Sequence, residues 1–164
     1  MIFETERLIV RKFTPADTEG FFLINGDEAV MKYIRPAKNK TDSDLFLNEN
    51  INLYADGSVV GRYAAVASAT GKIVGTFSLL YLAGGEDLHI GYALLPEEWG
   101  KGYATELTRR GTEYFFAHTN KEELFAITDV DNEPSQKVLL KAGFDKKREN
   151  PENGRVLAVF SVSR

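Results

Sequence analysis

The sequence IGYALLPEEWGKGYATE, residues 90–106, joins an apolar run to the start of a long helical pattern. Pro96 ends the apolar run, because proline lacks the N–H group that would continue a strand ladder. From Trp99 onward, apolar residues recur at helical spacing and charged residues fill the opposite side. Gly100 and Gly102 stand between the two patterns. The segment therefore predicts a strand, a glycine loop and an amphipathic helix.

The glycine loop has the features of an anion-binding site. The first turn of a helix leaves about four main-chain N–H groups without partners, and the aligned peptide dipoles place a partial positive charge there. Gly100 and Gly102 open backbone angles that other residues avoid, and they let a phosphate approach the main chain closely. The alternative is that these glycines only turn a strand into a helix. Neither the triphosphate motif G-x-x-x-x-G-K-[ST] nor the dinucleotide fingerprint G-x-G-x-x-G, which fails at Thr105, fits the loop.

The rest of the chain predicts a mixed α+β domain. Alternation of apolar residues and turn residues indicate strands at 5–13, 59–68, 72–82, 87–95 and 123–130 and a hairpin at 144–163. Capping residues and helical periodicity indicate four helices, which begin at Thr14, cover 42–57, begin at Trp99 and cover 132–143. The strand–helix–strand order around the glycine loop predicts a right-handed parallel crossover inside an otherwise antiparallel sheet. Because no linker or repeat divides the chain, we expect one domain over residues 1–164.

The composition excludes several classes of function. Lys and Arg number 20 against 24 Asp and Glu, so the net charge of −4 gives no basic surface for nucleic acid or anionic lipid. The absence of cysteine excludes disulfides, thiolate zinc sites and a covalent cysteine intermediate. No apolar run approaches the ~20 residues that span a bilayer, and the acidic N-terminus differs from a signal peptide. We therefore expect a cytoplasmic protein with no nucleic-acid partner, no membrane partner and no metal.

The spacing of Glu106 from Arg109 and Arg110 predicts ordinary ion pairs along one helix.

Residues 99–104 of the glycine loop also match a six-residue pattern. It begins with Arg, Gln or an aromatic residue, has Gly at its fourth position and Gly or Ala at its sixth, and accepts any residue at the other positions. This pattern resembles the coenzyme A loop of the GNAT N-acetyltransferases. Residues 90–106 are similar to the RimJ/RimL-like branch of that superfamily, which acetylates the N-termini of ribosomal proteins. Three other segments resemble the same branch, in the same order: ETERLIVRKF at 4–13, GDEAVMKYI at 26–34 and NEPSQKVLLKAGF at 132–144. The resemblance spans nearly the whole chain.

The resemblance implies a GNAT-like fold, which is a mixed and mostly antiparallel sheet with a central parallel pair of splayed strands, flanked by about four helices. It also implies acetyl-CoA as the acyl donor. The pantetheine arm would bind the splayed strand like a short extra strand, and the pyrophosphate would rest on main-chain N–H groups of the loop. The coenzyme-binding residues that it implies are Tyr92, Ala93, Leu94, Trp99, Gly100, Lys101, Gly102, Tyr103, Ala104, Thr105 and Asn132.

Two side chains are candidates for the proton transfers. Ser135 matches the serine that this branch offers to the leaving thiolate, although an early-helix serine equally binds its local backbone. His89 stands where branch members often carry Glu, and an imidazole with a pKa near ~6.5 suits the removal of an amine proton. The alternative for His89 is a partly exposed strand histidine. Many superfamily members place a tyrosine general acid at the position of Leu139, which has no proton to donate. Asn132 fits both a pantetheine contact and a helix N-cap.

These residues predict direct attack of a primary amine on the thioester in a ternary complex, because the chain has no cysteine to carry the acetyl group. The candidate acceptors are a protein N-terminus, a polyamine, an aminoglycoside or another small amine. The net charge and acids such as Asp42, Asp44 and Glu49 favour a cationic acceptor. We expect a monomer or a homodimer. The alternative function is a non-catalytic acyl-CoA-binding module, and a protein that binds a different diphosphate is a third hypothesis.

Overall fold

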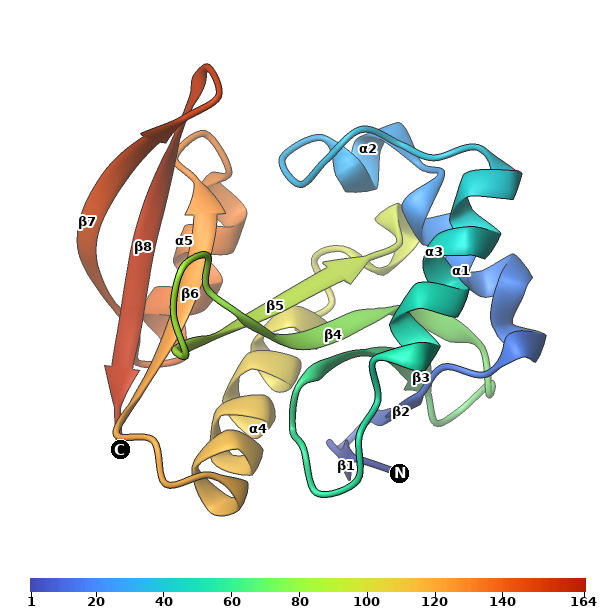
Figure 1. Ribbon diagram of the computed structural model, residues 1–164, viewed down its shortest axis with the longest axis horizontal. Coiled ribbons are helices and arrows are strands. Elements are labelled where there is room, and N and C mark those ends of the chain that lie inside the picture. Colours follow the sequence, from blue (N-terminus) through green and yellow to red (C-terminus); the bar gives the residue numbers. More distant parts are fainter.

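Eight strands form one sheet in the computed structural model, which describes residues 1–164 (Figure 1). Their order across the sheet is β1-β2-β3-β4-β5-β6-β8-β7. The strands are β1 (Phe3–Glu4), β2 (Leu8–Lys12), β3 (Gly61–Ala67), β4 (Ile73–Tyr81), β5 (Leu88–Leu94), β6 (Glu123–Asp129), β7 (Asp145–Glu152) and β8 (Arg155–Ser163). All neighbours are antiparallel except β5 and β6. The predicted α+β class and the parallel pair inside a mostly antiparallel sheet are confirmed.

Five α-helices and two short 3-10 turns accompany the sheet. They are η1 (Pro15–Asp17), α1 (Thr18–Asn25), α2 (Glu28–Met31), α3 (Lys40–Asn52), η2 (Pro96–Glu98), α4 (Tyr103–His118) and α5 (Glu133–Lys141). About four helices were expected, and the additional one is α2, which is a single turn of four residues. None of the helices combines the length and the apolar character needed to span a bilayer.

The helices cover both faces of the sheet, and the alternation of side chains along β3 shows how. Tyr63 and Ala65 belong to a core cluster with Leu107 of α4 and Leu139 of α5. The intervening Ala64 belongs to a second cluster, which contains residues of α1 and α3. Because successive side chains of a strand point to opposite faces, α4 and α5 cover one face and α1 and α3 cover the other.

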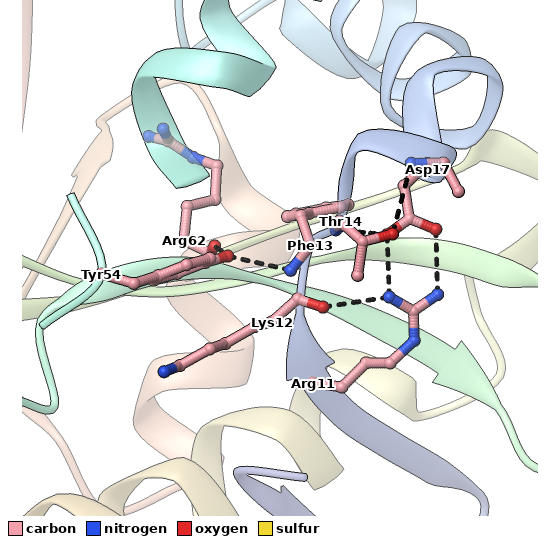
Figure 2. Close-up of polar contacts among 8 residues, drawn as sticks. Arg11, Lys12, Phe13, Thr14, Asp17, Tyr54 and Arg62 are labelled. Atoms are coloured by element: carbon pink, nitrogen blue, oxygen red, sulfur yellow. Dashed lines mark hydrogen bonds and ion pairs between the residues drawn. The ribbon is translucent and has the colours of Figure 1, made fainter. Parts of the chain in front are cut away.

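The corner between β2 and α1 is held by polar contacts (Figure 2). Thr14 and Asp17 form a capping box, in which the Asp17 carboxylate accepts the Thr14 N–H at 2.8 Å. Arg11 donates two hydrogen bonds to the same carboxylate, at 2.8 and 3.0 Å. The helix start expected at Thr14 is confirmed, and the Arg11–Asp17 pair fixes its angle to β2.

A tyrosine joins this corner to the sheet. The hydroxyl of Tyr54 accepts the N–H of Phe13 at 3.0 Å and donates to the carbonyl of Arg62 at the start of β3 (Figure 2). The Tyr54 ring also stacks on Tyr63, with 5.5 Å between ring centroids. These contacts fix the main chain of β3 at the point where the Arg62 side chain leaves the sheet.

Candidate active site

Strands β5 and β6 pair only at one end and then diverge (Figure 1). The paired residues are His89 with Phe125 and Ile90 with Ala126. Beyond them β5 continues along β4 as far as Leu94, so its other edge is open. The expected splay of the central parallel pair is therefore confirmed.

The peptide groups of β5 face alternately toward β4 and toward the opening. Leu95 donates its N–H to the carbonyl of Val74 on β4 at 2.9 Å, so its peptide group faces β4. Because the direction alternates along a strand, the peptide group of Ala93, two residues earlier, also faces β4. The peptide groups of Tyr92 and Leu94 consequently face the opening. The indole N–H of Trp99 donates to the Leu94 carbonyl at 2.8 Å and ties the glycine loop to the end of the strand. Two of the three strand residues expected at the coenzyme thus present main-chain groups to the opening.

A cavity of about 340 Å³ lies at the splayed strands. Its lining comes from α1, α2 and the segment after it, strands β3 to β6, α5 and the β7–β8 hairpin. It includes five of the residues that the sequence assigned to the site, which are His89, Tyr92, Ala93, Asn132 and Ser135. Leu94 and residues 99–105 lie outside this lining. The volume is in the range of small-molecule sites.

Ser135, Asn132 and Tyr92 form a connected polar group at the start of α5. The Asn132 side chain accepts the N–H of Ser135 at 3.3 Å. Asn132 is therefore the N-cap of α5, which was one of the two roles expected for it. The Tyr92 hydroxyl donates to the Ser135 hydroxyl oxygen at 3.3 Å. Burial raises the pKa of Tyr92, so its phenol stays protonated and keeps the Ser135 hydroxyl hydrogen free to point into the cavity. The sequence assigned only the main chain of Tyr92 to the site, and no local pattern signalled its hydroxyl.

His89 lies at the point where β5 leaves β6. It is opposite Leu80 on β4 and opposite Phe125 on β6, and its side chain lines the cavity. Burial lowers the pKa of His89, and the positive charge of Arg62 lowers it further. The imidazole is therefore neutral at pH 7 and able to accept a proton from a group inside the cavity.

The glycine loop keeps its amides free of internal bonds. Gly100 and Gly102 have φ values of +75° and +87°, the left-handed region that glycine adopts readily. The N–H of Trp99 is used, since it donates to the carbonyl three residues earlier at 3.2 Å, and the first helical bond of α4 comes from Glu106. The amides of residues 100–105 donate no hydrogen bond within the chain. A Cβ added at Gly100 would meet no atom within 4 Å, so the space in front of the loop is open.

Arg7, which the sequence reasoning did not single out, supports this loop. Its guanidinium donates to the Lys101 carbonyl at 2.7 Å and to the Glu106 carboxylate at 2.6 Å, and it lies 4.5 Å from the centroid of the Tyr103 ring. The hydroxyl of Thr5 donates to the same Glu106 carboxylate at 2.7 Å. These contacts orient the Lys101 peptide and the first turn of α4. The signal that could have found Arg7 is its place in ETERLIVRKF, one of the segments that resemble the family.

The predicted pairs of Glu106 with Arg109 and Arg110 are wrong, because Arg7 occupies Glu106 instead. Arg110 pairs with Glu113 at 3.2 Å, and Arg109 donates to the Lys141 carbonyl at 3.0 Å. Arg109, Arg110 and Lys141 line an open polar depression of about 520 Å³, which Gly102 and Thr105 also line. The loop therefore borders a surface with several cationic side chains.

Comparison with known proteins identifies the family, because residues 7–145 match the acetyltransferase (GNAT) domain. The chain belongs to the GNAT acetyltransferases. The uncharacterized N-acetyltransferase YoaA of Bacillus subtilis is 29% identical over 149 residues, which cover 89% of this chain and 84% of YoaA. A GNAT-family acetyltransferase from Bacillus anthracis has a TM-score of 0.84 and 24% identity over 98% of this chain and 96% of that one. RimL, a ribosomal L7/L12 α-N-protein acetyltransferase in complex with coenzyme A, has a TM-score of 0.83 and 15% identity over 99% and 97%. The family inferred from the sequence is confirmed, and the protein is an acyltransferase.

In this GNAT protein the β3 side of the cavity and the hairpin side carry arginines. Arg35, Arg62 and Arg155 line the cavity. Arg155 of β8 donates to the carbonyl of Tyr33 at 2.8 Å and so ties the β7–β8 hairpin to the segment after α2. The β7–β8 hairpin and the segment after α2, which both line the cavity, are thus joined to each other.

The acids that were expected to favour a cationic acceptor lie elsewhere. Asp42, Asp44 and Glu49 are on α3, and none of them lines the cavity. Asp44 pairs with Lys40 at 2.7 Å on the same helix. The charge inside the cavity is therefore set by other side chains.

Proposed function

We propose that this protein transfers the acetyl group of acetyl-CoA to a primary amine by direct attack in a ternary complex. The observation that carries the proposal is one cavity at the splayed strands that contains His89 and the Tyr92–Ser135 pair. It lies beside a helix start whose amides, residues 100–105, are free of internal bonds. The shared fold with RimL in its coenzyme A complex supports the same ligand here.

Coenzyme binding would use main-chain groups. The free amides of residues 100–105 and the N-terminus of α4 would hold the pyrophosphate, because both are electropositive and the space before Gly100 is open. The pantetheine would follow the open edge of β5, where the peptide groups of Tyr92 and Leu94 face it. Asn132, whose side chain caps α5, lies on the opposite wall of the same cavity and remains a candidate contact.

The amine would then attack the thioester carbonyl. A peptide α-amine, with a pKa of about 7.7–8.0, is roughly 10–15% neutral at pH 7, whereas a lysine-type amine at about 10.4 is neutral on the order of 0.04% of the time. Neutral His89 would take the proton that the nitrogen loses, a role that matters most for the more basic amine. The Leu94 N–H, which faces the opening, would stabilise the developing oxyanion.

Departure of the thiolate completes the transfer. The Ser135 hydroxyl would donate a hydrogen bond to the sulfur, and the Tyr92 hydroxyl would polarise Ser135 by donating to its oxygen. A free thiol has a pKa of about 8.5, which is below that of a phenol, so the hydroxyls of Tyr92 and Ser135 keep their protons and stabilise the thiolate by hydrogen bonding. The proton that the sulfur finally gains comes from the amine. Nitrogen gains the acyl carbon and loses one proton, and sulfur loses the acyl carbon and gains one.

A thiol-release assay with acetyl-CoA tests the proposal across N-terminal peptides, spermidine, aminoglycosides and small amines. We expect thiol release that depends on one class of amine and on enzyme concentration. Thermal shifts with coenzyme A, NAD and ATP accompany the assay, and we expect stabilisation by coenzyme A alone. Coenzyme binding without turnover of any amine would favour the non-catalytic acyl-CoA-binding module, and stabilisation by NAD or ATP instead would favour a different diphosphate ligand. Sedimentation of the purified protein decides between the two expected states, a monomer and a homodimer.

A further inference from the structure

Two arginines line the cavity without any carboxylate partner. Arg35, on the segment after α2, donates to the side-chain oxygen of Asn25 at 2.7 Å. Arg62, on β3, donates to the side-chain oxygen of Asn50 at 2.8 Å. Both partners are neutral amides. Neither arginine takes part in any of the ion pairs of the chain.

The two guanidinium groups lie against the same aromatic ring, that of Phe46. Their central carbons are 4.9 and 5.0 Å from the centroid of the Phe46 ring, for Arg35 and Arg62 respectively. The Nε of Arg35 is buried and has no hydrogen-bond partner. Burial lowers the pKa of Arg62 to about 10, and the neighbouring charge of Arg35 contributes to this. Both side chains still carry a full positive charge at neutral pH.

No other group of the cavity neutralises this pair. The charged residues of the lining besides Arg35 and Arg62 are Arg155, Asp129 and Glu152. Asp129 accepts the N–H of Asp131 at 2.9 Å, and neither acid forms an ion pair with an arginine. Two partly buried cations that share one ring are unfavourable unless an anion joins them, because removal from water costs each charge several kcal/mol.

Arg62 lies two strands away from β5, on the face of the sheet that His89 also occupies. Arg62 is opposite Ser78 on β4, and Ser78 is opposite Gly91 on β5, so the three residues form one row across the sheet. Two strand spacings, about 10 Å, separate the main chains of Arg62 and Gly91. The Arg62 side chain extends toward α3 (Figure 2). There it donates a hydrogen bond to the side-chain oxygen of Asn50. The row therefore runs from Arg62 to Gly91 of β5, three residues before Leu94, whose N–H would face the thioester carbonyl.

We propose that the amine acceptor carries an oxyanion, most simply a carboxylate, which Arg35 and Arg62 bind while the amine reaches β5 and His89. The planar guanidinium forks match a carboxylate or phosphonate, and the free Arg35 Nε is a donor still to be used. The size of the cavity and the two-strand distance fit a small amino acid or a short ω-amino acid. This inference rests on the proposed function, since it names the substrate class of the same site. It also replaces the cationic acceptor expected from the net charge.

The test compares amino acids with their amides, which keep the amine and lose the anion. Calorimetric titrations use glycine, β-alanine, 4-aminobutyrate and the eighteen L-amino acids of proteins that carry a primary α-amine, each against its matching amide, on the full chain saturated with coenzyme A. Thiol-release assays use the same pairs with acetyl-CoA. We expect at least one acid to bind about tenfold or more tightly than its amide, with the preference lost in Arg62→Gln and Arg35→Gln. Arg62→Lys is expected to restore part of it, because lysine keeps the charge without the fork.

Lys38→Gln is the matched control. Lys38 also lies over the Phe46 ring, at 4.8 Å, but it does not line the cavity, so its loss should leave the preference for the acid unchanged. Melting temperatures of all variants report folding, and either arginine variant alone suffices if the other fails to fold. Equal or tighter binding of the amides by the wild type overturns the inference, as does turnover of spermidine or peptides in preference to every acid. Arg62-dependent binding of an acid without thiol release would instead overturn the proposed transfer and leave the anion site standing.

Discussion

The two ends of the site are built in different ways. The glycine loop is a contiguous segment whose main-chain amides, residues 100–105, form the proposed anion site, with Arg7 and Glu106 as supports. The proposed acceptor end consists of side chains, and Arg35 and Arg62 reach the Phe46 ring of α3 from separate elements. A main-chain site depends on local backbone angles, whereas a side-chain site depends on how the whole chain packs. Substitutions should therefore damage the two ends through different measurable quantities.

The largest effect is expected where the two ends meet, at Ser135. Ser135→Ala should lower kcat on the order of a hundredfold, because the thiolate loses its hydrogen-bond donor, and should leave coenzyme affinity unchanged. Tyr92→Phe should act in the same way but more weakly, and the double variant should be little worse than Ser135→Ala because the two hydroxyls act as one unit. Steady-state kinetics and coenzyme titration measure these effects. Ser161→Ala, which removes a hydroxyl bonded to Glu123 outside the cavity, is the control, and an unchanged kcat in Ser135→Ala would remove Ser135 from the mechanism.

The main-chain end should fail through binding rather than through kcat. Gly100→Ala is expected to weaken coenzyme A affinity by about thirtyfold, because a Cβ at φ +75° strains the loop and occupies the space before the amides. Gly71→Ala is the matched control, since Gly71 has φ +72° and also has no atom within 4 Å of an added Cβ. Both variants should lose about 1 kcal/mol of stability, and only Gly100→Ala should lose affinity. Equal affinity in the two variants would contradict the pyrophosphate assignment.

The support of the loop should show a smaller effect. Arg7→Gln is expected to weaken coenzyme A affinity by about tenfold, because the Lys101 carbonyl loses its side-chain donor and the Glu106 carboxylate loses the guanidinium. Glu106→Gln should produce a similar loss, and a double-mutant cycle measured by calorimetry should give a coupling of about 1–2 kcal/mol. Glu113→Gln breaks the exposed pair with Arg110 and should change affinity by less than twofold. Additive losses at Arg7 and Glu106 would show that they do not act through one loop conformation.

The smallest expected effect is a change in the pKa of His89 when the positive charge of Arg62 is removed. Burial and Arg62 both lower the pKa of His89, so its imidazole should titrate below its ordinary pKa of about 6.5. Because removal of a positive neighbour favours the protonated form, Arg62→Gln should raise this pKa toward the ordinary value. Proton NMR of the imidazole measures it, and since the chain has two histidines, a His118→Asn variant assigns the signals. A pKa at or above the ordinary value in the wild type would contradict a buried, neutral base.

Sequence reasoning succeeded where neighbouring residues decide the structure. The capping box at Thr14 and the turn that joins β7 to β8, with Asn153 and Gly154 at positive φ, follow from residues within a few positions of one another. It failed at Glu106, which was expected to pair along its own helix and instead pairs with Arg7, 99 residues away. Helix periodicity identifies which residues could pair locally, but it contains no information about a partner supplied by another strand.

The strand–glycine–helix junction, the α+β class and the family follow from the sequence, because backbone angles, caps and hydrophobic periodicity act over short distances. The contact of the Tyr92 hydroxyl with Ser135, 43 residues away, and the place of Arg35 and Arg62 in one cavity without a carboxylate partner depend on the fold. Those contacts depend on where β5 leaves β6 and on how α1 to α3 pack over the sheet. A side chain acquires its electrostatic partners from residues remote in sequence, so the chemistry of the acceptor end emerges only when the chain is folded.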